Sequence, residues 1–334
     1  MKRFILISSL IFTGLVSAQE INGGPVNVPT EGVIDGVYLT EHVPTKRMIP
    51  YEFVREADVL WSKRVWRTID MREKINHTMY LPFDYHTPSG EYVRNSSRWS
   101  LWTILRHHIV SGELKVFYPM NPLQESMKDG DQFKYPLAAE AGKDYSNDSL
   151  FARKLIEFKM LGYKGVESDQ AISNAAGDGD SVIYLADGSP KTVYPAVDTF
   201  WYDSKDIVQY QLKEDWFFDK ERSVMDVRIL GLAPVIYERD ENNQILGSRV
   251  LYWVYFPHCR YILNNYFVYN EQNDANWMSF DDLFWKRQFN STIFKESNVF
   301  DREIETYRTG VDALMESEKI TEEIRNYEHD VWNF

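Results

Sequence analysis

The sequence predicts an α+β protein with N-terminal helices, a central and mainly antiparallel sheet, C-terminal helices and an extended N-terminal arm. Three observations lead to this fold class. Apolar residues first recur at the spacing of a helix, then alternate with polar residues from about residue 181, and return to helical spacing from about residue 279. Strands that follow one another closely in sequence favour antiparallel pairing. Helices, then strands, then helices is the order of an α+β domain rather than of repeated βαβ units.

The N-terminus has the residue order of a secretory signal peptide. Lys2 and Arg3 precede the apolar run 4–16, and small residues end at Ala18, which predicts cleavage after that residue. The run is too short to span a bilayer as a stable helix, and no later stretch approaches ~20 apolar residues. We therefore expect residues 1–18 to be a signal peptide, and the mature protein to be exported without inserting directly into a membrane.

The segment after the signal peptide contains "NGGPVNVPTEGVIDGV", which is rich in Gly and Pro and has no helical period. It lacks the local apolar periodicity that would offset the entropy of ordering it. We expect residues 19–50 to form an extended arm that is mobile in the isolated protein and ordered in an assembly. Residues 51–334 show no internal repeat and no clear break, so we expect a single α+β domain there.

The run "DVLWSKRVWRTIDMREK", residues 58–74, concentrates cations and tryptophans in a chain of formal charge −13. Wound as a helix at ~100° per residue, it places both tryptophans on one arc and most of its cations on the other. We expect the tryptophans to be buried within the chain, and Arg64 and Arg67 to face outward and meet acidic surface on a neighbouring subunit. A solvated charged face is the alternative. The candidate partner-binding residues are Trp61, Lys63, Arg64, Trp66 and Arg67.

The remaining elements follow from the same two periods. Helical spacing predicts helices in the segments 96–112, 147–162, 279–289 and 301–330. Alternation predicts strands in the segments 113–119, 206–218, 223–239, 248–263 and 265–270. Residues 181–197 read as a hairpin around an Asp-Gly turn. His107 and His108 should point to different sides of their helix, one near the core and the other at the surface.

The charge distribution excludes one class of partner and suggests another. A net acidic chain lacks the basic footprint that phosphate binding needs, so nucleic acid is not expected. Residues 301–330 carry ten acidic side chains against four basic ones, whereas residues 58–74 are locally basic. Such a molecule could associate head to tail with its own copies, and heterologous contacts of this kind generate rings or filaments. Docking of the two segments within one chain is the alternative.

Signals for catalysis and cofactors are weak. The seven histidines include no H-x-x-x-H pair, and neither a G-x-S-x-G elbow nor a Walker A loop is present. We therefore predict no catalytic, cofactor-binding or metal-binding residues. Cys259, the single cysteine, is expected to be a small buried hydrophobe. A glycosidase pair could hide among the carboxylates, for example Glu214 and Asp215, because their separation cannot be read from sequence.

Two long motifs resemble a known family. The segment "DVLWSKRVWRTIDMREKIN" followed by "YLPFDY", and the tail "TGVDALMESEKITEEIRNYEHDVW", resemble the GldN/PorN family of the type IX secretion system and gliding motility machinery of Bacteroidota. The resemblance implies a non-enzymatic structural component of the periplasm, without cofactors, that associates with the outer-membrane lipoprotein GldK/PorK in a ring. It also implies contact with the periplasmic region of GldM/PorM, self-association within the ring, and a role in protein secretion.

A second reading of the residues belongs to a different class. Strands rich in aromatic residues, with carboxylates beside them, also suit an exported carbohydrate-binding protein or glycoside hydrolase. Such a protein needs a cleft in which Trp and Tyr converge with two or three polar groups. An assembly protein should instead present flat aromatic patches.

Overall fold

An antiparallel sheet of eight strands organises the chain. The computed structural model describes residues 48–87, 92–95, 98–124, 128–137, 155–156, 158–164, 182–184, 190–192, 199–239, 244–270, 273 and 278–332. Seven strands follow the order β16-β1-β10-β11-β13-β4-β5, and β12 pairs with β11 beside this path. All of these pairs are antiparallel. The described residues therefore form an α+β structure with a central antiparallel sheet, in agreement with the sequence.

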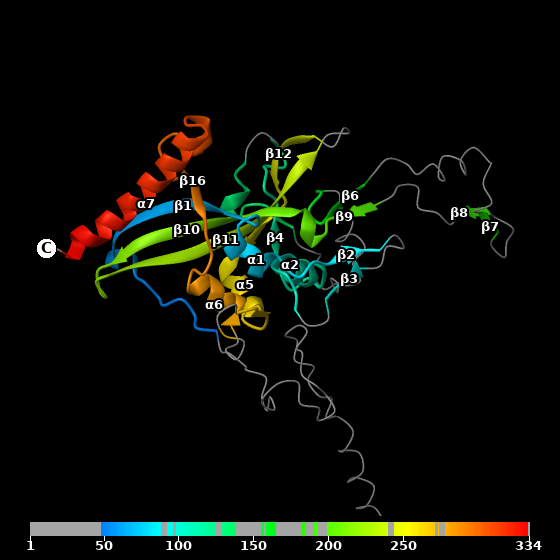
Figure 1. Ribbon diagram of the computed structural model, residues 1–334, viewed down its shortest axis with the longest axis horizontal. Coiled ribbons are helices and arrows are strands. Elements are labelled where there is room, and N and C mark those ends of the chain that lie inside the picture. Colours follow the sequence, from blue (N-terminus) through cyan, green and yellow to red (C-terminus); the bar gives the residue numbers. More distant parts are fainter. Residues whose placement is uncertain are drawn as a thin grey trace, which may run out of the picture.

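Three long strands cross the molecule, and shorter strands flank them (Figure 1). The long strands are β1 (Val59–Asp70), β10 (Ile207–Asp219) and β11 (Val224–Arg239). The shorter strands of the sheet are β4 (Val116–Phe117), β5 (Pro136–Leu137), β12 (Ile245–Val250), β13 (Trp253–Tyr255) and β16 (Thr292–Glu296). Four separate pairs are β2 (Tyr85–His86) with β3 (Tyr92–Val93), β6 (Gly162–Lys164) with β9 (Thr199–Trp201), β7 (Val182–Tyr184) with β8 (Pro190–Thr192), and β14 (Phe267–Val268) with β15 (Met278–Ser279).

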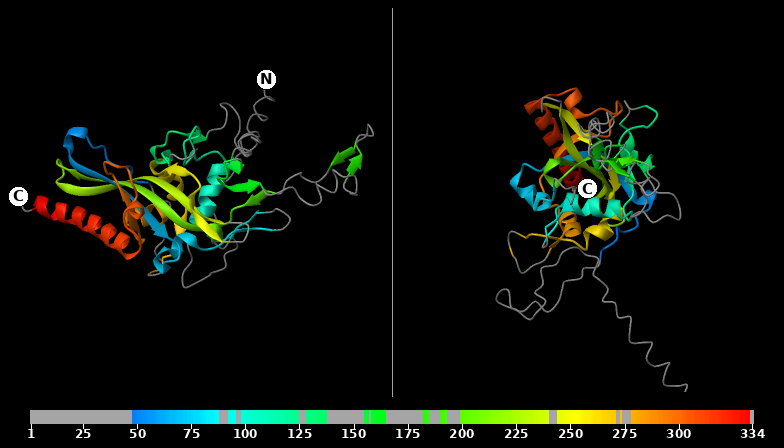
Figure 2. Two further views of the ribbon diagram at one scale, coloured as in Figure 1. Left: turned by 90° about the horizontal axis from the view of Figure 1, so that it is seen from above. Right: turned by 90° about the vertical axis from the view of Figure 1, so that its right-hand side faces the viewer.

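The helices lie around this sheet. They are α1 (His77–Tyr80), α2 (Leu101–Val110), α5 (Phe256–Leu263), α6 (Phe280–Trp285) and α7 (Val311–Trp332). Short 3-10 turns are η1 (Glu56–Asp58), η2 (Lys74–Asn76), η3 (Gly130–Gln132), η5 (Ser204–Asp206) and η6 (Ile304–Thr306). The long helix α7 lies outside the sheet next to β16, while α5 and α6 lie together under the sheet (Figures 1 and 2).

The helix predicted for residues 58–74 is wrong, because most of this run is strand β1. Its backbone pairs with β10 along the whole strand and with β16 over residues 65–68. Alternation replaces the helical arcs: Trp61, Lys63, Val65, Arg67 and Ile69 share one face of the sheet, and Ser62, Arg64, Trp66 and Thr68 share the other. Tryptophan and β-branched residues fit a pleated surface well. The partners that decide between strand and helix lie about 150 residues away in β10.

Two hydrophobic clusters are built on the first face of β1. Ile69 belongs to the main core, where side chains of α2, α5 and α6 pack against Tyr210, Leu212 and Leu232 of the sheet. Val65 belongs to a smaller cluster with residues of β16, η6 and α7: Ile293, Ile304, Ile320 and Ile324. The C-terminal helix is therefore attached by an apolar cluster of its own.

Helix α2 forms where the sequence predicts it. Ser100 caps it, since its side chain accepts a hydrogen bond from the amide of Thr103. His108 is buried and His107 is exposed, so the expectation that they take different sides is confirmed. Helix α6 also lies within its predicted segment, whereas α7 starts ten residues later than the predicted segment 301–330 and ends two residues beyond it.

The segment 248–263 is only partly the strand that its alternation predicts. Strand β13 ends at Tyr255, and α5 begins at Phe256 with Pro257 in its first turn. Proline suits the first turn of a helix because it has no amide hydrogen to donate there. Cys259 is fully buried in this helix, as expected, and burial raises the pKa of its thiol. Strand β16 is an element that the sequence analysis missed.

Several expectations fall partly or wholly outside the described residues. The signal peptide at 1–18, most of the arm at 19–50 and most of the predicted helix at 147–162 lie there. The antiparallel pairing of β7 with β8 agrees with the predicted hairpin, although the turn between them is outside the described residues. The first described residues, from 48 onward, lead to Tyr51, whose ring stacks on that of Trp285, the last residue of α6, at a centroid distance of 5.8 Å.

Candidate assembly surface around strand β1

The five candidate partner-binding residues all lie on β1, but the strand divides them differently from a helix. Trp61, Lys63 and Arg67 are on the face that α7 covers, and Arg64 and Trp66 are on the opposite face. The two tryptophans are therefore not on one side, nor are the two arginines. Each of the five makes contacts within the chain.

Trp61 and Lys63 hold the C-terminal helix. The indole of Trp61 stacks on the ring of Tyr327 in α7, with centroids 4.5 Å apart. The ammonium group of Lys63 lies 2.7 Å from the carboxylate of Glu296 in β16 and 3.5 Å from that of Glu323 in α7. At these residues the structure shows the alternative left open by the sequence: basic and acidic segments dock within one chain.

Arg67 is buried, so the expectation that it faces outward is wrong. It forms an ion pair with the fully buried carboxylate of Glu214 at 3.2 Å, and Arg287 approaches the same carboxylate to 2.9 Å. The ring of Trp216 lies 5.9 Å from the guanidinium of Arg67 and 5.4 Å from that of Arg287. Burial lowers the pKa of Arg67, and the charge of Glu214 opposes this shift. Two cations thus share one buried anion between β1, β10 and the end of α6.

Arg64 does face outward, as predicted, but it already has a carboxylate. Its Nε and Nη2 donate to the two oxygens of Asp215 at 2.6 and 2.7 Å, and this hydrogen bonding raises the pKa of Arg64. The side chains of Arg64 and Asp215 are 44% and 29% exposed, so the pair is partly solvated. Its contact with a neighbouring subunit stays a prediction.

Trp66 is buried, in agreement with the prediction, but it lies on the same face as Arg64, which the helix had placed on the opposite side. Its indole nitrogen donates to Asp131 at 3.1 Å, and the ammonium group of Lys295 lies 4.7 Å from its ring. Trp66 and Trp253 line an open cleft of about 540 Å³. The two residues are only 7% and 5% exposed, so neither ring offers a free face on which a sugar could stack.

Glu214 and Asp215 do not form a glycosidase pair. Consecutive residues of a strand point to opposite faces of the sheet, and these two carboxylates are held by different guanidinium groups on those faces. No substrate could lie between them. This geometry removes the carboxylate pair that the sequence suggested for a hydrolase.

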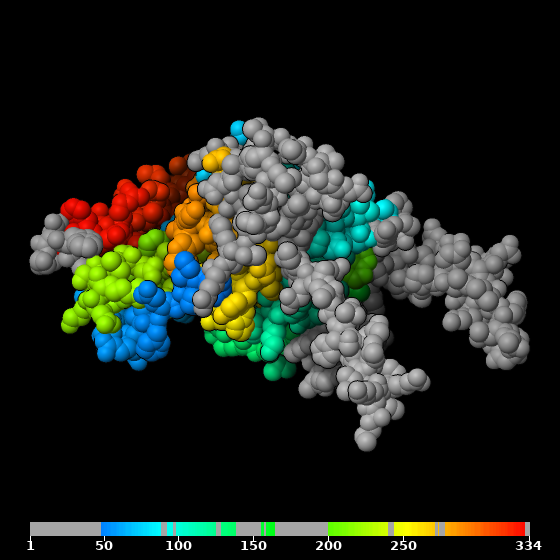
Figure 3. Space-filling model, turned by 90° about the horizontal axis from the view of Figure 1, so that it is seen from below, coloured from blue at the N-terminus to red at the C-terminus, as the bar shows by residue number. Residues whose placement is uncertain are grey.

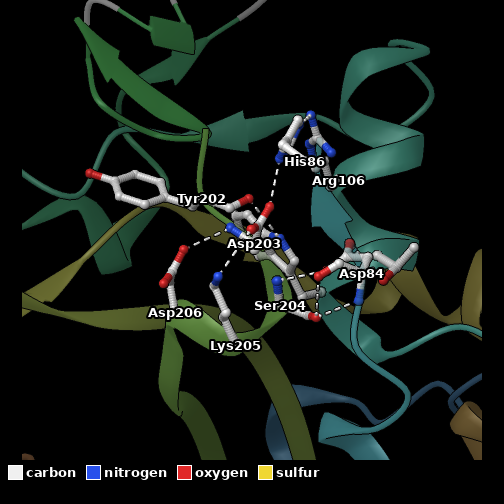
Figure 4. Close-up of polar contacts among 10 residues, drawn as sticks. Asp84, His86, Arg106, Tyr202, Asp203, Ser204, Lys205 and Asp206 are labelled. Atoms are coloured by element: carbon white, nitrogen blue, oxygen red, sulfur yellow. Dashed lines mark hydrogen bonds and ion pairs between the residues drawn. The ribbon is translucent and has the colours of Figure 1, made fainter. Parts of the chain in front are cut away.

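A second polar cluster, which sequence reasoning missed, joins β2, α2 and η5 (Figure 4). His86 contacts the carboxylate of Asp203 through Nδ1 at 2.5 Å and the guanidinium of Arg106 through Nε2 at 2.8 Å. Because a guanidinium only donates hydrogen bonds, Nε2 accepts and Nδ1 donates. Neither ring nitrogen is then free to take a proton from a nucleophile. The cluster resembles a triad in composition, but its contacts are structural.

The same cluster includes two fully buried side chains, those of Asp84 and Ser204. Asp84 accepts hydrogen bonds from the amide of Ser204 at 2.6 Å and from the hydroxyl of Thr103 at 2.9 Å. The hydroxyl of Ser204 in turn accepts a hydrogen bond from the amide of Asp84 at 2.8 Å. The only local sequence signal is the capping box formed by Asp203 and Asp206. The other contacts join residues far apart in sequence, which no local pattern reveals.

The described part of the chain shows neither a metal site nor a membrane-spanning helix. Among these residues no three His, Cys, Asp or Glu side chains are gathered in a way that could hold a metal ion. None of the helices described is long and apolar enough to cross a bilayer.

Taken together, charged and aromatic side chains of β1 and β10 fasten α7 and the end of α6 to the sheet of an α+β protein. Comparison with known proteins identifies the family to which this protein belongs. A family model described as gliding motility associated protein GldN matches residues 54–333, from just before β1 through α7. The chain belongs to the GldN family, and hence to the gliding motility machinery. A search of curated proteins found no match.

Proposed function

We propose that this protein is a non-enzymatic, periplasmic structural component of the type IX secretion system and gliding motility apparatus. It assembles with the outer-membrane lipoprotein GldK/PorK into a ring and also contacts the periplasmic region of GldM/PorM. The observation that carries the proposal is the family match over residues 54–333, which includes both motifs that the sequence analysis singled out. The signal peptide expected at residues 1–18 supports export to the periplasm.

The contacts among the described residues suit a rigid structural subunit. Three long strands give it an extended axis, and α7 is fastened to that axis by apolar, aromatic and ionic contacts. The buried Glu214 binds two cations from separate elements, and removing one partner of such a pair is costly. These contacts favour a stiff body that keeps its surfaces in fixed positions. A ring subunit needs this property because small errors in subunit angle accumulate around a closed ring.

A deletion strain tests the proposal. We expect removal of the gene to abolish both gliding and secretion of proteins with C-terminal type IX signals, and the wild-type gene to restore them. The gene that encodes the Asp215→Asn variant is a control that should also restore both, because the ion pair of Asp215 with Arg64 is partly solvated and contributes little to stability. Normal secretion in the deletion strain would contradict the proposal.

A further inference from the structure

The side of α7 that faces away from the sheet carries large apolar side chains. Val311, Leu314 and Met315 are 71%, 59% and 67% exposed. Residues three and four positions apart are neighbours on a helix, so these three form one contiguous surface. The opposite stripe, with Ile320 and Ile324, is buried in the small cluster against β1 and β16. Figure 3 shows α7, in red, at one end of the molecule.

Acidic side chains continue this surface along the helix. Asp312, Glu318 and Glu322 are exposed, and none of them forms an ion pair within the described part of the chain. Together with Met315, Glu316, Arg308 and Lys319 they line a shallow hollow of about 550 Å³, in which acidic side chains outnumber basic ones four to two. We define the outer face of α7 as Val311, Asp312, Leu314, Met315, Glu318 and Glu322. It combines an apolar anchor site with net negative charge.

We propose that the outer face of α7 docks a basic amphipathic segment of a partner protein. This inference rests on the proposed function for the existence of a partner and adds the chemistry that recognises it. Apolar side chains of the partner would cover Leu314 and Met315. Lysine or arginine side chains beside them would pair with Glu318 and Glu322, since complementary charge fixes register and speeds association.

The charge pattern disfavours a second copy of α7 as the occupant. Glu318 and Glu322 lie close to the middle of the helix, so two copies packed antiparallel would bring this acidic band against itself. Like charges in contact oppose association. The basic residues that could have served a neighbouring copy, Lys63 and Arg67, are already used within the chain.

The outer face is also held in place before any partner arrives. The stack of Trp61 on Tyr327 and the ion pair of Lys63 with Glu323 fix the C-terminal half of α7. The apolar cluster that contains Ile320 fixes its middle. Docking on a preorganised helix avoids the entropy of ordering that helix during binding.

Site-specific photo-crosslinking in the assembled envelope complex tests the proposal. A photoreactive residue replaces Met315 in the full-length chain, and the crosslinked peptide is sequenced. Leu60, which is also exposed but lies at the start of β1, provides the control position. We expect position 315 to yield a peptide of another protein with net positive charge and apolar residues, and position 60 not to yield it. A crosslink to α7 of a second copy, a crosslink to an acidic segment, or no crosslink at position 315 would overturn the proposal.

Charge reversal adds a second readout. The Glu318→Lys and Glu322→Lys substitutions together should reduce the crosslink yield roughly fivefold. Together the exposed ion pairs contribute up to ~1 kcal/mol to binding, and 1.4 kcal/mol corresponds to a tenfold change in affinity. The same change of charge at Glu56 and Glu238, both exposed and outside α7, should leave the yield unchanged. An equal loss in both variants would contradict recognition by α7. Failure of the whole proposed function would appear separately, as absence of the chain from any complex with the lipoprotein.

Discussion

Trp61 of β1 and Tyr327 of α7 stack with their ring planes inclined by 19° and their centroids 4.5 Å apart. The contact joins the first strand of the sheet to the last helix of the chain. It stands beside the ion pair of Lys63 with Glu323, so one aromatic and one charged contact link the same two elements. These two contacts hold α7 in a fixed position against the sheet.

A double-mutant cycle measures the stack directly. We expect Trp61→Ala and Tyr327→Ala each to destabilise the protein, and the double variant to lose less than the sum by ~0.5–1.5 kcal/mol, the usual coupling of an aromatic pair. Urea unfolding of the four proteins supplies the free energies. Leu60→Ala is the control, since Leu60 is exposed and its loss should stay within ~0.5 kcal/mol. Strict additivity of the two changes would show that the rings do not interact.

Glu214 and Asp215 form a natural pair of matched substitutions. Glu214→Gln leaves the guanidinium groups of Arg67 and Arg287 without their buried anion and should cost ~3–5 kcal/mol. Asp215→Asn breaks only the partly solvated pair with Arg64 and should cost about 1 kcal/mol or less. Both free energies of unfolding come from urea denaturation at neutral pH. Equal losses at the two positions would contradict the different burial of the two pairs.

The joint variant Lys63→Glu, Arg64→Glu and Arg67→Glu distinguishes the strand β1 from the helix that the sequence predicted for the same residues. A solvent-facing basic arc would leave the stability of the monomer nearly unchanged. The structure predicts clear destabilisation instead, because Arg67→Glu sets a second carboxylate against the buried Glu214 and Lys63→Glu faces Glu323. Thermal unfolding of the three single variants should rank Arg67→Glu as the most harmful and Arg64→Glu as the least. A melting temperature unaffected by Arg67→Glu would argue against the internal docking.

The error at β1 has a physical cause. Trp61, Val65 and Ile69 are spaced four apart and so satisfy a helix, while the alternation of Trp61, Lys63, Val65, Arg67 and Ile69 satisfies a strand equally well. Pairing with β10 and β16 decides between them, and these strands lie far away in sequence. Long elements with local signals, such as α2, α7, β10 and β11, were predictable. At Pro257 the start of α5 also had a local signal, which the alternation of the preceding strand obscured.

The candidate site was predictable only in part. The sequence identified the residues of β1 that make charged and aromatic contacts, and it identified the acidic C-terminal segment that receives some of them. It could not show that the two segments dock within one chain, since docking within and between chains satisfies the same charges. The cluster around His86 had no comparable signal, because its members come from three distant segments.

Stability at high pH depends on buried tyrosines. Burial raises the pKa values of Tyr51, Tyr202 and Tyr266 from the ordinary 10.0 to about 12. The unfolded chain releases these protons at lower pH than the folded protein, so stability is present below pH 10 and is lost as the pH rises toward 12. We expect the urea midpoint to fall between those values, with phenolate absorbance increasing on unfolding. Ionisation of all tyrosines near pH 10 in a folded protein would contradict their burial.

The measurement that tests the central claim most directly is the size and composition of the native particle. The tagged full-length chain is purified from gently solubilised envelopes, and the particle is sized and its proteins identified. The account predicts that the mature chain, which is smaller than the 39.4 kDa precursor, elutes in a particle many times its own mass together with the lipoprotein GldK/PorK. In a strain that lacks the chain, the lipoprotein should no longer elute at that size. A chain that elutes as a monomer, with the lipoprotein absent from its fractions, would contradict the account.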